Sequence, residues 1–297
     1  MTVLSARAQA KVNLTLRVLG RRAADGYHLL ESLVCFADVG DDIALRPGGP
    51  LELRVNGPMA AAAGETQDNL VLRAARALER RVPSFAAGAF SLEKRLPVGA
   101  GLGGGSADAA AALRLLAQAN GLAAGDARLY DAARETGSDV PVCIASRARW
   151  MGGTGHVLSP PVAMPRLHAV LANPGVPLAT RDVYGALGAA AVSDDAAGGC
   201  FDPPALPQGQ RAFVAFIERL PNDLEAPAIR LAPAVGSVLA ALREQPACVL
   251  ARMSGSGSTC FGVFATAGAA KLAARTLMIR NPGWWVRDAA LGADPAA

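Results

Sequence analysis

The sequence of 297 residues lacks several patterns that would each indicate a particular class of protein. No uninterrupted apolar run approaches the length of a membrane span, and the N-terminus has no signal-peptide pattern. The formal charge of +4 favours an anionic ligand, but there is no dense Lys/Arg block that would support nucleic-acid binding. These absences predict a soluble cytoplasmic protein that binds neither nucleic acid nor membrane.

Cysteine, histidine and aromatic residues are also scarce. The five cysteines are scattered and include no C-x-x-C pair, which is typical of reduced, mostly buried thiols and not of disulfides or zinc. The three histidines lack H-E-x-x-H spacing and so do not support a histidine-based metal centre. Because only 5% of the residues are aromatic, we expect a core of alanine, valine and leucine.

Glycine is plentiful, and five of the 32 glycines lie within residues 99–105. An alanine-rich stretch without proline follows from Ser106 to Asn120 and predicts a helix. Glycine permits positive φ and the close approach of a ligand, while a helix N-terminus offers unpaired N–H groups. The pattern therefore predicts a phosphate-binding loop, in which Ser106 caps the helix or contacts phosphate or a metal ion.

Three other interpretations of this loop have less support. The spacing Gly99-x-Gly101-x-x-Gly104 fits a dinucleotide fingerprint, but residues 93–97 are charged and contain proline where that fold needs a hydrophobic strand. A P-loop fails because no lysine precedes Ser106. A flexible glycine linker stays open, although such linkers seldom continue into so regular a helix.

Residues 10–18 alternate between apolar and polar side chains, which predicts a half-buried strand. Lys11 and Asn13 lie on its polar face, where a solvated lysine is the usual expectation. Asp139 precedes the apolar residues 140–142, so its carboxylate either caps a turn or needs a buried partner. Lys11 could be that partner, but spacing alone does not decide it.

Two further loops carry groups suited to ligand recognition. Tyr27 and His28 place an aromatic face beside ring nitrogens, which suits a planar base, although simple packing and turn capping explain them equally well. Residues 254–259 form a second glycine-rich loop between two expected strands at 249–253 and 260–265. This loop could bind an anion through its N–H groups, or it could be a plain hairpin turn.

The remaining elements alternate in a mixed order, which favours an α+β fold over a repeating βαβ sheet. High glycine density near residues 151–155 places a domain boundary there, giving domains 1–154 and 155–297. We expect a hairpin over 41–55, a strand at 167–172, a loose surface excursion over 185–210, and helices at 69–81, 127–135, 211–220, 233–244 and 267–279.

Three segments resemble the motifs of the GHMP kinases, a family named for galactokinase and the homoserine, mevalonate and phosphomevalonate kinases. They are the strand around Lys11, the loop 97–107, which is the most specific, and the loop 254–260. The resemblance implies an N-terminal domain like the second domain of ribosomal protein S5, a ferredoxin-like C-terminal domain and a cleft between them.

Four segments narrow the resemblance: residues 10–14, 22–28, 101–108 and 137–141. They are similar to the family members that phosphorylate the 2-hydroxyl of a cytidine diphosphate polyol in the non-mevalonate route to isoprenoids. The resemblance therefore implies ATP as the phosphoryl donor, with Mg²⁺ accompanying it. We also expect a monomer or weak dimer.

The resemblance also implies a role for each matching residue. Asp139 would be the base for the hydroxyl, and Lys11 would be its electrostatic partner. The substrate would be bound by Asn13, Tyr27, His28, Thr180 and Tyr184, the aromatic residues holding the cytosine. The ATP phosphates would be wrapped by Pro97, Val98, Gly99, Ala100, Gly101, Leu102, Gly103, Gly104, Gly105, Ser106 and Ala107.

Other functions remain to be tested against this hypothesis. Another GHMP kinase, such as one for mevalonate or homoserine, would not need Tyr27 and His28. A non-catalytic nucleotide-binding protein on the same fold would not need both Lys11 and Asp139. A nicotinamide-dependent oxidoreductase is the remote third alternative.

Overall fold

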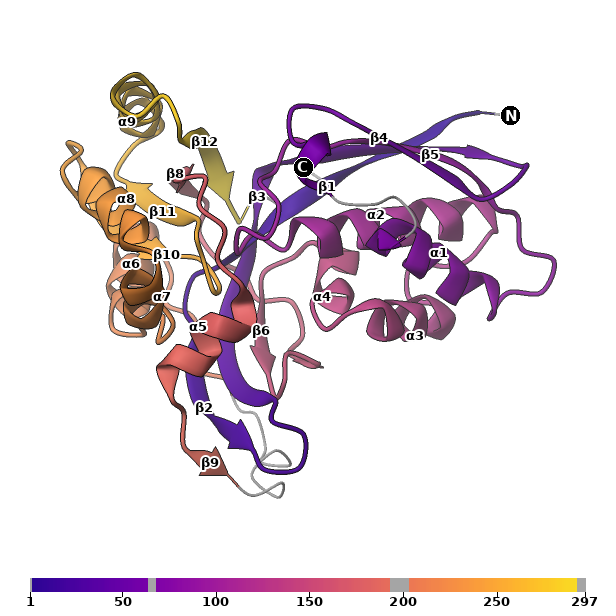
Figure 1. Cartoon of the computed structure of the whole chain (residues 1–297), viewed down its shortest axis with the longest axis horizontal. Helices are drawn as coiled ribbons and strands as arrows, with labels where there is room; N and C mark the ends of the chain where they lie inside the picture. The colour runs from indigo at the N-terminus through magenta and orange to yellow at the C-terminus, as the bar shows by residue number, and fades with distance from the viewer. Residues whose placement is uncertain (1, 64–67, 193–202, 293–297) are drawn as a thin grey trace. The chain divides into compact units, whose positions relative to one another are not determined.

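The computed structural model describes residues 2–63, 68–192 and 203–292 (Figure 1). The chain forms two compact units, each built from several chain segments. Unit 1 contains residues 1–11, 40–98 and 103–146, and unit 2 contains residues 12–39, 99–102 and 147–297. Each unit contains helices and strands, so the expected α+β class is confirmed. The division into contiguous domains 1–154 and 155–297 stays a prediction.

The strands of unit 1 show why the expected hairpin over residues 41–55 is wrong. Strand β3 (His28–Pro47) and strand β4 (Glu52–Asn56) follow each other in sequence, but β5 (Gly88–Glu93) lies between them. It pairs antiparallel with β3 and parallel with β4. Parallel neighbours need a long crossover, and helix α1 (Leu70–Glu79) lies on the connection from β4 to β5. The glycine-proline turn after β3 therefore ends one strand without pairing it to the next.

Helix α2 (Gly104–Ala119) confirms the helix expected after the glycine loop. Its alanines at positions 109–112 are completely buried, and so are Leu113 and Leu116. Small side chains on several sides allow neighbouring helices to pack closely around α2. In Figure 1 the helices of this unit gather on one side of β1, β4 and β5. The remaining elements of unit 1 are β1 (Leu4–Asn13), which continues into unit 2, η1 (Ala60–Ala63), α3 (Ala127–Thr136) and α4 (Val140–Ala145).

The expectation of one half-buried strand over residues 10–18 is wrong. Strand β1 ends at Asn13, and β2 (Arg17–Arg22) begins four residues later. Lys11 and Asn13 are each only 4% exposed, so at the end of β1 the polar face is buried like the apolar face. Alternation identifies the two faces of a strand but does not say what covers the polar one.

Unit 2 is built on the strand order β10-β11-β8-β12-β3-β2-β9, with β6 also paired to β3. The antiparallel pair β10–β11 confirms the two strands expected around the second glycine-rich loop. A core of aliphatic residues, Met253 and Phe264 lies between these strands and the helices. The elements are β6 (Arg149–Gly152), β7 (Val157–Leu158), β8 (Leu167–Asn173), α5 (Thr180–Leu187), β9 (Ala191–Val192), α6 (Gln210–Glu218), α7 (Glu225–Leu231), α8 (Pro233–Arg243), β10 (Cys248–Met253), β11 (Cys260–Phe264), α9 (Ala267–Arg280) and β12 (Trp285–Leu291).

Three smaller expectations can be compared with the described residues. The excursion expected over 185–210 begins inside α5 and contains β9, while residues 193–202 lie outside the described part. The four described cysteines are free thiols and three of them are buried, whereas Cys200 lies outside the described part. Within the described ranges, no helix combines the length and the apolar character needed to cross a bilayer.

Candidate functional site

The first group of candidate residues is an ion pair in unit 1. Nζ of Lys11, on β1, lies 2.8 Å from Oδ2 of Asp139. The side chain of Lys11 is 5% exposed and that of Asp139 is 35% exposed. The partner that the sequence left open for Asp139 is therefore Lys11, although 128 residues separate the two. The carboxylate of the pair is therefore accessible to solvent, whereas its ammonium is buried.

The position of Asp139 leaves its carboxylate available. Asp139 occupies the N-cap position of α4, but its side chain makes no capping hydrogen bond there. The alternative of a helix-capping aspartate is thus wrong. Cys143 in the same helix is not a competing nucleophile, because burial raises the pKa of its thiol to about 12.

The glycine loop adopts the conformations that its composition predicts. Gly99, Gly101 and Gly103 have φ values of +63°, +75° and +60°, in the region that favours glycine. Gly103 is the N-cap of α2 and no side chain caps this helix, so of the two roles left open for Ser106, that of helix cap is wrong. Ser106 is instead the third residue of α2. The first turn of α2 therefore presents backbone N–H groups, which is the arrangement that binds phosphate.

Residues 99–102 of the loop belong to unit 2, where they contact the second glycine-rich loop. Thr259 donates its backbone N–H to the carbonyl of Ala100 at 3.1 Å, and the hydroxyl of Ser254 donates to the carbonyl of Gly101 at 2.9 Å. A Cβ on Gly101 would lie 2.3 Å from the carbonyl oxygen of Ser254, so only glycine fits there. The loop 254–259 is more than a hairpin turn, because it holds part of the first loop.

The same loop collects two of the predicted substrate residues. The backbone N–H of Asn13 donates to the hydroxyl of Ser254 at 3.1 Å, and its side-chain amide donates to Ser32 at 2.7 Å. The hydroxyl of Thr180, the first residue of α5, lies 2.8 Å from that of Ser256. Sequence reasoning did not assign roles to Ser254 and Ser256, because serines in a turn carry no signal of what they contact.

A second group of predicted substrate residues forms an aromatic cluster in unit 2. The rings of His28 and Tyr184 are 4.6 Å apart between centroids and inclined by 34°. Tyr27 is 63% exposed and leaves its ring accessible. Burial, together with the charge of Arg21, lowers the pKa of His28, so its ring is neutral near pH 7 and offers one donor and one acceptor nitrogen.

A buried charge cluster in unit 1 was not foreseen from the sequence. Nζ of Lys94 lies 2.5 Å from Oδ2 of Asp41 and 2.6 Å from Oδ2 of Asp108. Lys94 lies in the charged segment before the glycine loop, and Asp108 follows that loop in α2. The available signal was the single charge of Asp108 in an alanine-rich run, but the sequence could not show that the three side chains meet.

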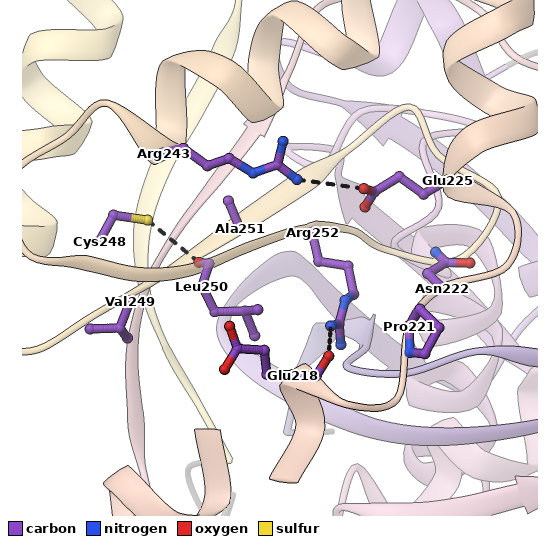
Figure 2. Close-up of a pocket in the computed structure, with 10 residues that line it drawn as sticks. All are labelled: Glu218, Pro221, Asn222, Glu225, Arg243, Cys248, Val249, Leu250, Ala251 and Arg252. Carbon is purple, nitrogen blue, oxygen red and sulfur yellow. Dashed lines mark hydrogen bonds and ion pairs between the residues drawn. The ribbon is translucent and has the colours of Figure 1, made fainter. Parts of the chain in front are cut away.

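The cavity of about 370 Å³ in Figure 2 lies in unit 2 and includes none of the predicted site residues in its lining. Three of its charged side chains, those of Glu225, Arg243 and Arg252, already have partners. Glu225 accepts from the backbone N–H of Met253 at 2.8 Å and lies 3.6 Å from Arg243. The guanidinium of Arg252 donates to several backbone carbonyls, including that of Leu220 at the end of the turn after α6. These interactions indicate a structural role for this region.

No cluster of three or more His, Cys, Asp or Glu side chains suited to a metal ion occurs among residues 2–63, 68–192 and 203–292. Magnesium that arrives with ATP does not need such a cluster, since it keeps several waters and takes most other ligands from the phosphates. The hydroxyl of Ser106 and the half-exposed carboxylate of Asp139 are oxygen groups of the kind that this ion accepts. The residues present are therefore compatible with a magnesium–ATP complex.

Two family models match the chain. The GHMP kinases N terminal domain matches residues 69–147, and the GHMP kinases C terminal model matches residues 210–281. Among curated proteins, a 4-diphosphocytidyl-2-C-methyl-D-erythritol kinase of Xanthobacter autotrophicus is 56% identical over 295 residues, covering 98% of this chain and all of the relative. A protein of the same name from Methylobacterium radiotolerans is 56% identical over 288 residues, covering 96% and 98% of the two chains.

Solved structures give the same result for the fold. A crystal structure of 4-(cytidine 5'-diphospho)-2C-methyl-D-erythritol kinase has a TM-score of 0.77 at 32% identity and covers 98% of this chain and all of that one. A homoserine kinase from Cytophaga hutchinsonii has a TM-score of 0.68 at 18% identity, covering 97% and 94% of the two chains. At that identity the second likeness concerns the fold alone.

Proposed function

Because this chain belongs to the GHMP kinase family, among its 4-diphosphocytidyl-2-C-methyl-D-erythritol kinases, we propose that Lys11, Asp139 and the glycine loop carry out its reaction. The reaction is ATP-dependent phosphorylation of the substrate's 2-hydroxyl, giving the 2-phosphate and ADP, in the non-mevalonate route to isoprenoids. The observation that supports these roles most directly is the 2.8 Å contact between Lys11 and Asp139.

Asp139 acts as the base in this proposal. Its carboxylate accepts the proton of the 2-hydroxyl as that oxygen attacks the γ-phosphorus, and ADP leaves with the electrons of the broken P–O bond. Lys11 holds the carboxylate in place through its ammonium and adds positive charge where negative charge is transferred. Phosphoryl transfer depends mainly on such positioning and charge stabilisation, which suits a site with few reactive groups.

The ATP phosphates bind at residues Pro97 to Ala107. Three glycines of this loop have positive φ, and the uncapped start of α2 offers its N–H groups to an anion. Ser106 would contact either the phosphates or a Mg²⁺ ion that accompanies them, and that ion would neutralise part of their charge.

His28, Tyr27 and Tyr184 recognise the cytosine. The contact of His28 with Tyr184 fixes the imidazole ring, whose neutral form can donate and accept hydrogen bonds on the edge of a base. The exposed ring of Tyr27 is free to stack on the base. Asn13 and Thr180 bind the polyol part. The proposal includes contiguous domains 1–154 and 155–297 and a cytoplasmic protein that is a monomer or weak dimer.

The experiment combines an assay of the full reaction with a variant directed at recognition of the cytosine. Purified protein is incubated with ATP, Mg²⁺ and 4-diphosphocytidyl-2-C-methyl-D-erythritol, and both ADP and the phosphorylated product are measured. His28→Ala is expected to raise the KM for the cytidyl substrate about tenfold or more while the KM for ATP changes little. His156→Ala, a histidine of an exposed turn, is the matched control. No ADP from the wild-type protein would refute the proposal, and equal effects on both KM values would refute the role of His28.

A further inference from the structure

The buried cluster of Lys94, Asp41 and Asp108 lies at both ends of the glycine loop. The side chains are 5%, 0% and 3% exposed, and the ammonium bridges the two carboxylates at 2.5 and 2.6 Å. All three residues belong to unit 1. In the proposed reaction none of them touches ATP or the second substrate, so their burial in this place needs another explanation.

Asp41 fixes the start of the loop. Its Oδ1 accepts hydrogen bonds from the backbone N–H groups of Arg95, at 2.5 Å, and Leu96, at 2.8 Å. These are the two residues immediately before Pro97, the first residue of the loop. Because Asp41 is on β3, one carboxylate joins the chain that approaches the loop to the sheet of unit 1.

Lys94 and Asp108 fix the end of the loop. Asp108 is the fifth residue of α2, one turn after the N–H groups proposed to bind phosphate. Nζ of Lys94 lies against the first residue of the same helix, since a Cβ on Gly104 would be only 3.2 Å away from it. The ammonium therefore ties the segment before the loop to the first turns of the helix after it.

The cluster is costly in a way that a purely packing role does not require. Two carboxylates share one ammonium, and Oδ1 of Asp108 is buried without a hydrogen-bond partner among the described residues. Apolar residues of similar volume often stabilise a protein as well as a buried ion cluster does, whereas an unpartnered buried oxygen destabilises it. Charged groups, unlike apolar ones, make directional hydrogen bonds. Here they hold the backbone N–H groups of Arg95 and Leu96 in fixed positions.

We propose that Asp41, Lys94 and Asp108 are positioning residues that set the separation between Leu96 and Gly104, and thereby the conformation in which the loop binds the ATP phosphates. The inference rests on the proposed function, because that function assigns the loop to ATP. Hydrogen bonds of the cluster join only residues of unit 1, whereas His28 and Tyr184 belong to unit 2. A disturbed cluster should therefore weaken binding of ATP and not binding of the cytidyl group.

The test uses variants of nearly unchanged shape. Asp41→Asn and Asp108→Asn each remove one buried charge, and Asp42→Asn removes a charge from the adjacent residue, whose half-exposed side chain pairs with Arg7 and Arg95 at the surface. For each protein one measures kcat, the KM for each substrate, the Kd of a non-hydrolysable ATP analogue and the thermal midpoint. Assays are made well below all of the midpoints.

Asp41→Asn is expected to raise the KM for ATP and the Kd of the analogue about tenfold, with a smaller rise in Asp108→Asn. The KM for the cytidyl substrate should stay within about twofold in both, and Asp42→Asn should match the wild type. If the buried variants lower only the thermal midpoint and leave ATP binding unchanged, the positioning role is refuted. If Asp41→Asn fails to fold, Asp108→Asn alone decides between these results. A wild-type protein without turnover would instead refute the proposed function.

Discussion

Two of the three lysines in this chain lie against consecutive glycines at the start of α2, in very different surroundings. A Cβ on Gly103 would lie 3.2 Å from Cε of Lys11, and one on Gly104 would lie 3.2 Å from Nζ of Lys94. Lys11 pairs with one carboxylate whose side chain is 35% exposed. Lys94 is enclosed by two carboxylates that are almost completely buried.

This difference in the exposure of the carboxylates fits two different tasks, taking part in a reaction and holding the backbone in place. A pair with a partly exposed carboxylate can exchange a proton with a substrate, so the exposure of Asp139 fits the role of base that we propose for it. A cluster closed to water cannot reach a substrate, but its hydrogen bonds hold backbone groups in fixed positions. The four predictions below test whether the two lysines divide these tasks.

The largest effect is expected on turnover, at the open pair. Asp139→Asn keeps the shape of the side chain but removes the proton acceptor, so kcat should fall by about 10²- to 10⁴-fold. Because the variant leaves the buried ammonium of Lys11 without its carboxylate, the thermal midpoint should also fall, so kcat is measured well below it. Asp131→Asn, on the exposed face of α3 beside Arg134, is the control and should keep wild-type turnover. Retention of most of kcat in Asp139→Asn would exclude its catalytic role.

The second effect is on stability, at the closed cluster. Lys94→Met leaves two buried carboxylates without a cation, and loss of one partner from a buried ion pair costs about 3–5 kcal/mol. The free energy of unfolding from denaturant titration measures this loss. Lys271→Met, on the exposed face of α9, should change stability by about 0.5 kcal/mol at most. Equal stability of the two variants would mean that the cluster contributes nothing to the fold.

A smaller effect distinguishes neighbouring glycines of the loop. In Gly104→Ala the new methyl group meets Nζ of Lys94, which its carboxylates hold in place. The free energy of unfolding, measured by denaturant titration, should therefore fall by about 1–2 kcal/mol. In Gly105→Ala the nearest atom is Cδ1 of Leu70 at 3.4 Å, an ordinary contact. Since alanine favours a helix over glycine, Gly105→Ala should be neutral or stabilising by about 0.5 kcal/mol. Equal losses in both variants would contradict a fixed position for Lys94.

The smallest effect is a pH dependence of stability. Burial raises the pKa of Asp108 from its ordinary 3.8 to about 7, against the attraction of Lys94, while the charge of Asp41 also raises it. The folded chain therefore binds a proton at the carboxyl group of Asp108 more tightly than the unfolded chain does. Its contribution to stability is complete below 3.8 and is lost as the pH rises through about 7.

Asp108→Asn has no such proton and should lack this part of the pH dependence. The thermal midpoint of the wild type relative to that of Asp108→Asn should fall by a few degrees between about pH 5 and pH 8. Differential scanning calorimetry at several pH values measures it. A constant difference between the two proteins would show that Asp108 does not change protonation in this range.

Local pattern predicted much of the fold because short-range rules determine helices. The alanine run before Asn120 and the apolar spacing in residues 69–81 each gave the correct helix to within two residues at most ends. The strands expected on either side of loop 254–259 were also correct, because they too follow from local pattern. Strand pairing was not predictable in the same way. The expected hairpin over 41–55 failed because β5, which begins 32 residues after the end of β4, pairs with both β3 and β4.

The candidate site shows the same division between what local pattern predicts and what tertiary contacts decide. Lys11, Asp139 and the glycine loop could be nominated because their residue types and order are informative, and their catalytic and binding roles stay predictions. Ser106 as the helix cap was wrong, because the left-handed conformation of Gly103 starts the helix earlier than a side-chain cap would. Lys94 was passed over as part of a charged approach to the loop, although it is almost completely buried.

The sequence by itself determined the α+β class and the family to which the chain belongs, because composition, motifs and local order suffice for both, and it nominated the glycine loop as the phosphate site of the proposed reaction. Only the tertiary structure decided which carboxylates the two lysines meet. Lys11 reaches Asp139 across 128 positions of sequence, and Lys94 reaches Asp41 across 53. Such pairs depend on how the strands of unit 1 and its helices pack together, and no rule of spacing along the chain contains that packing.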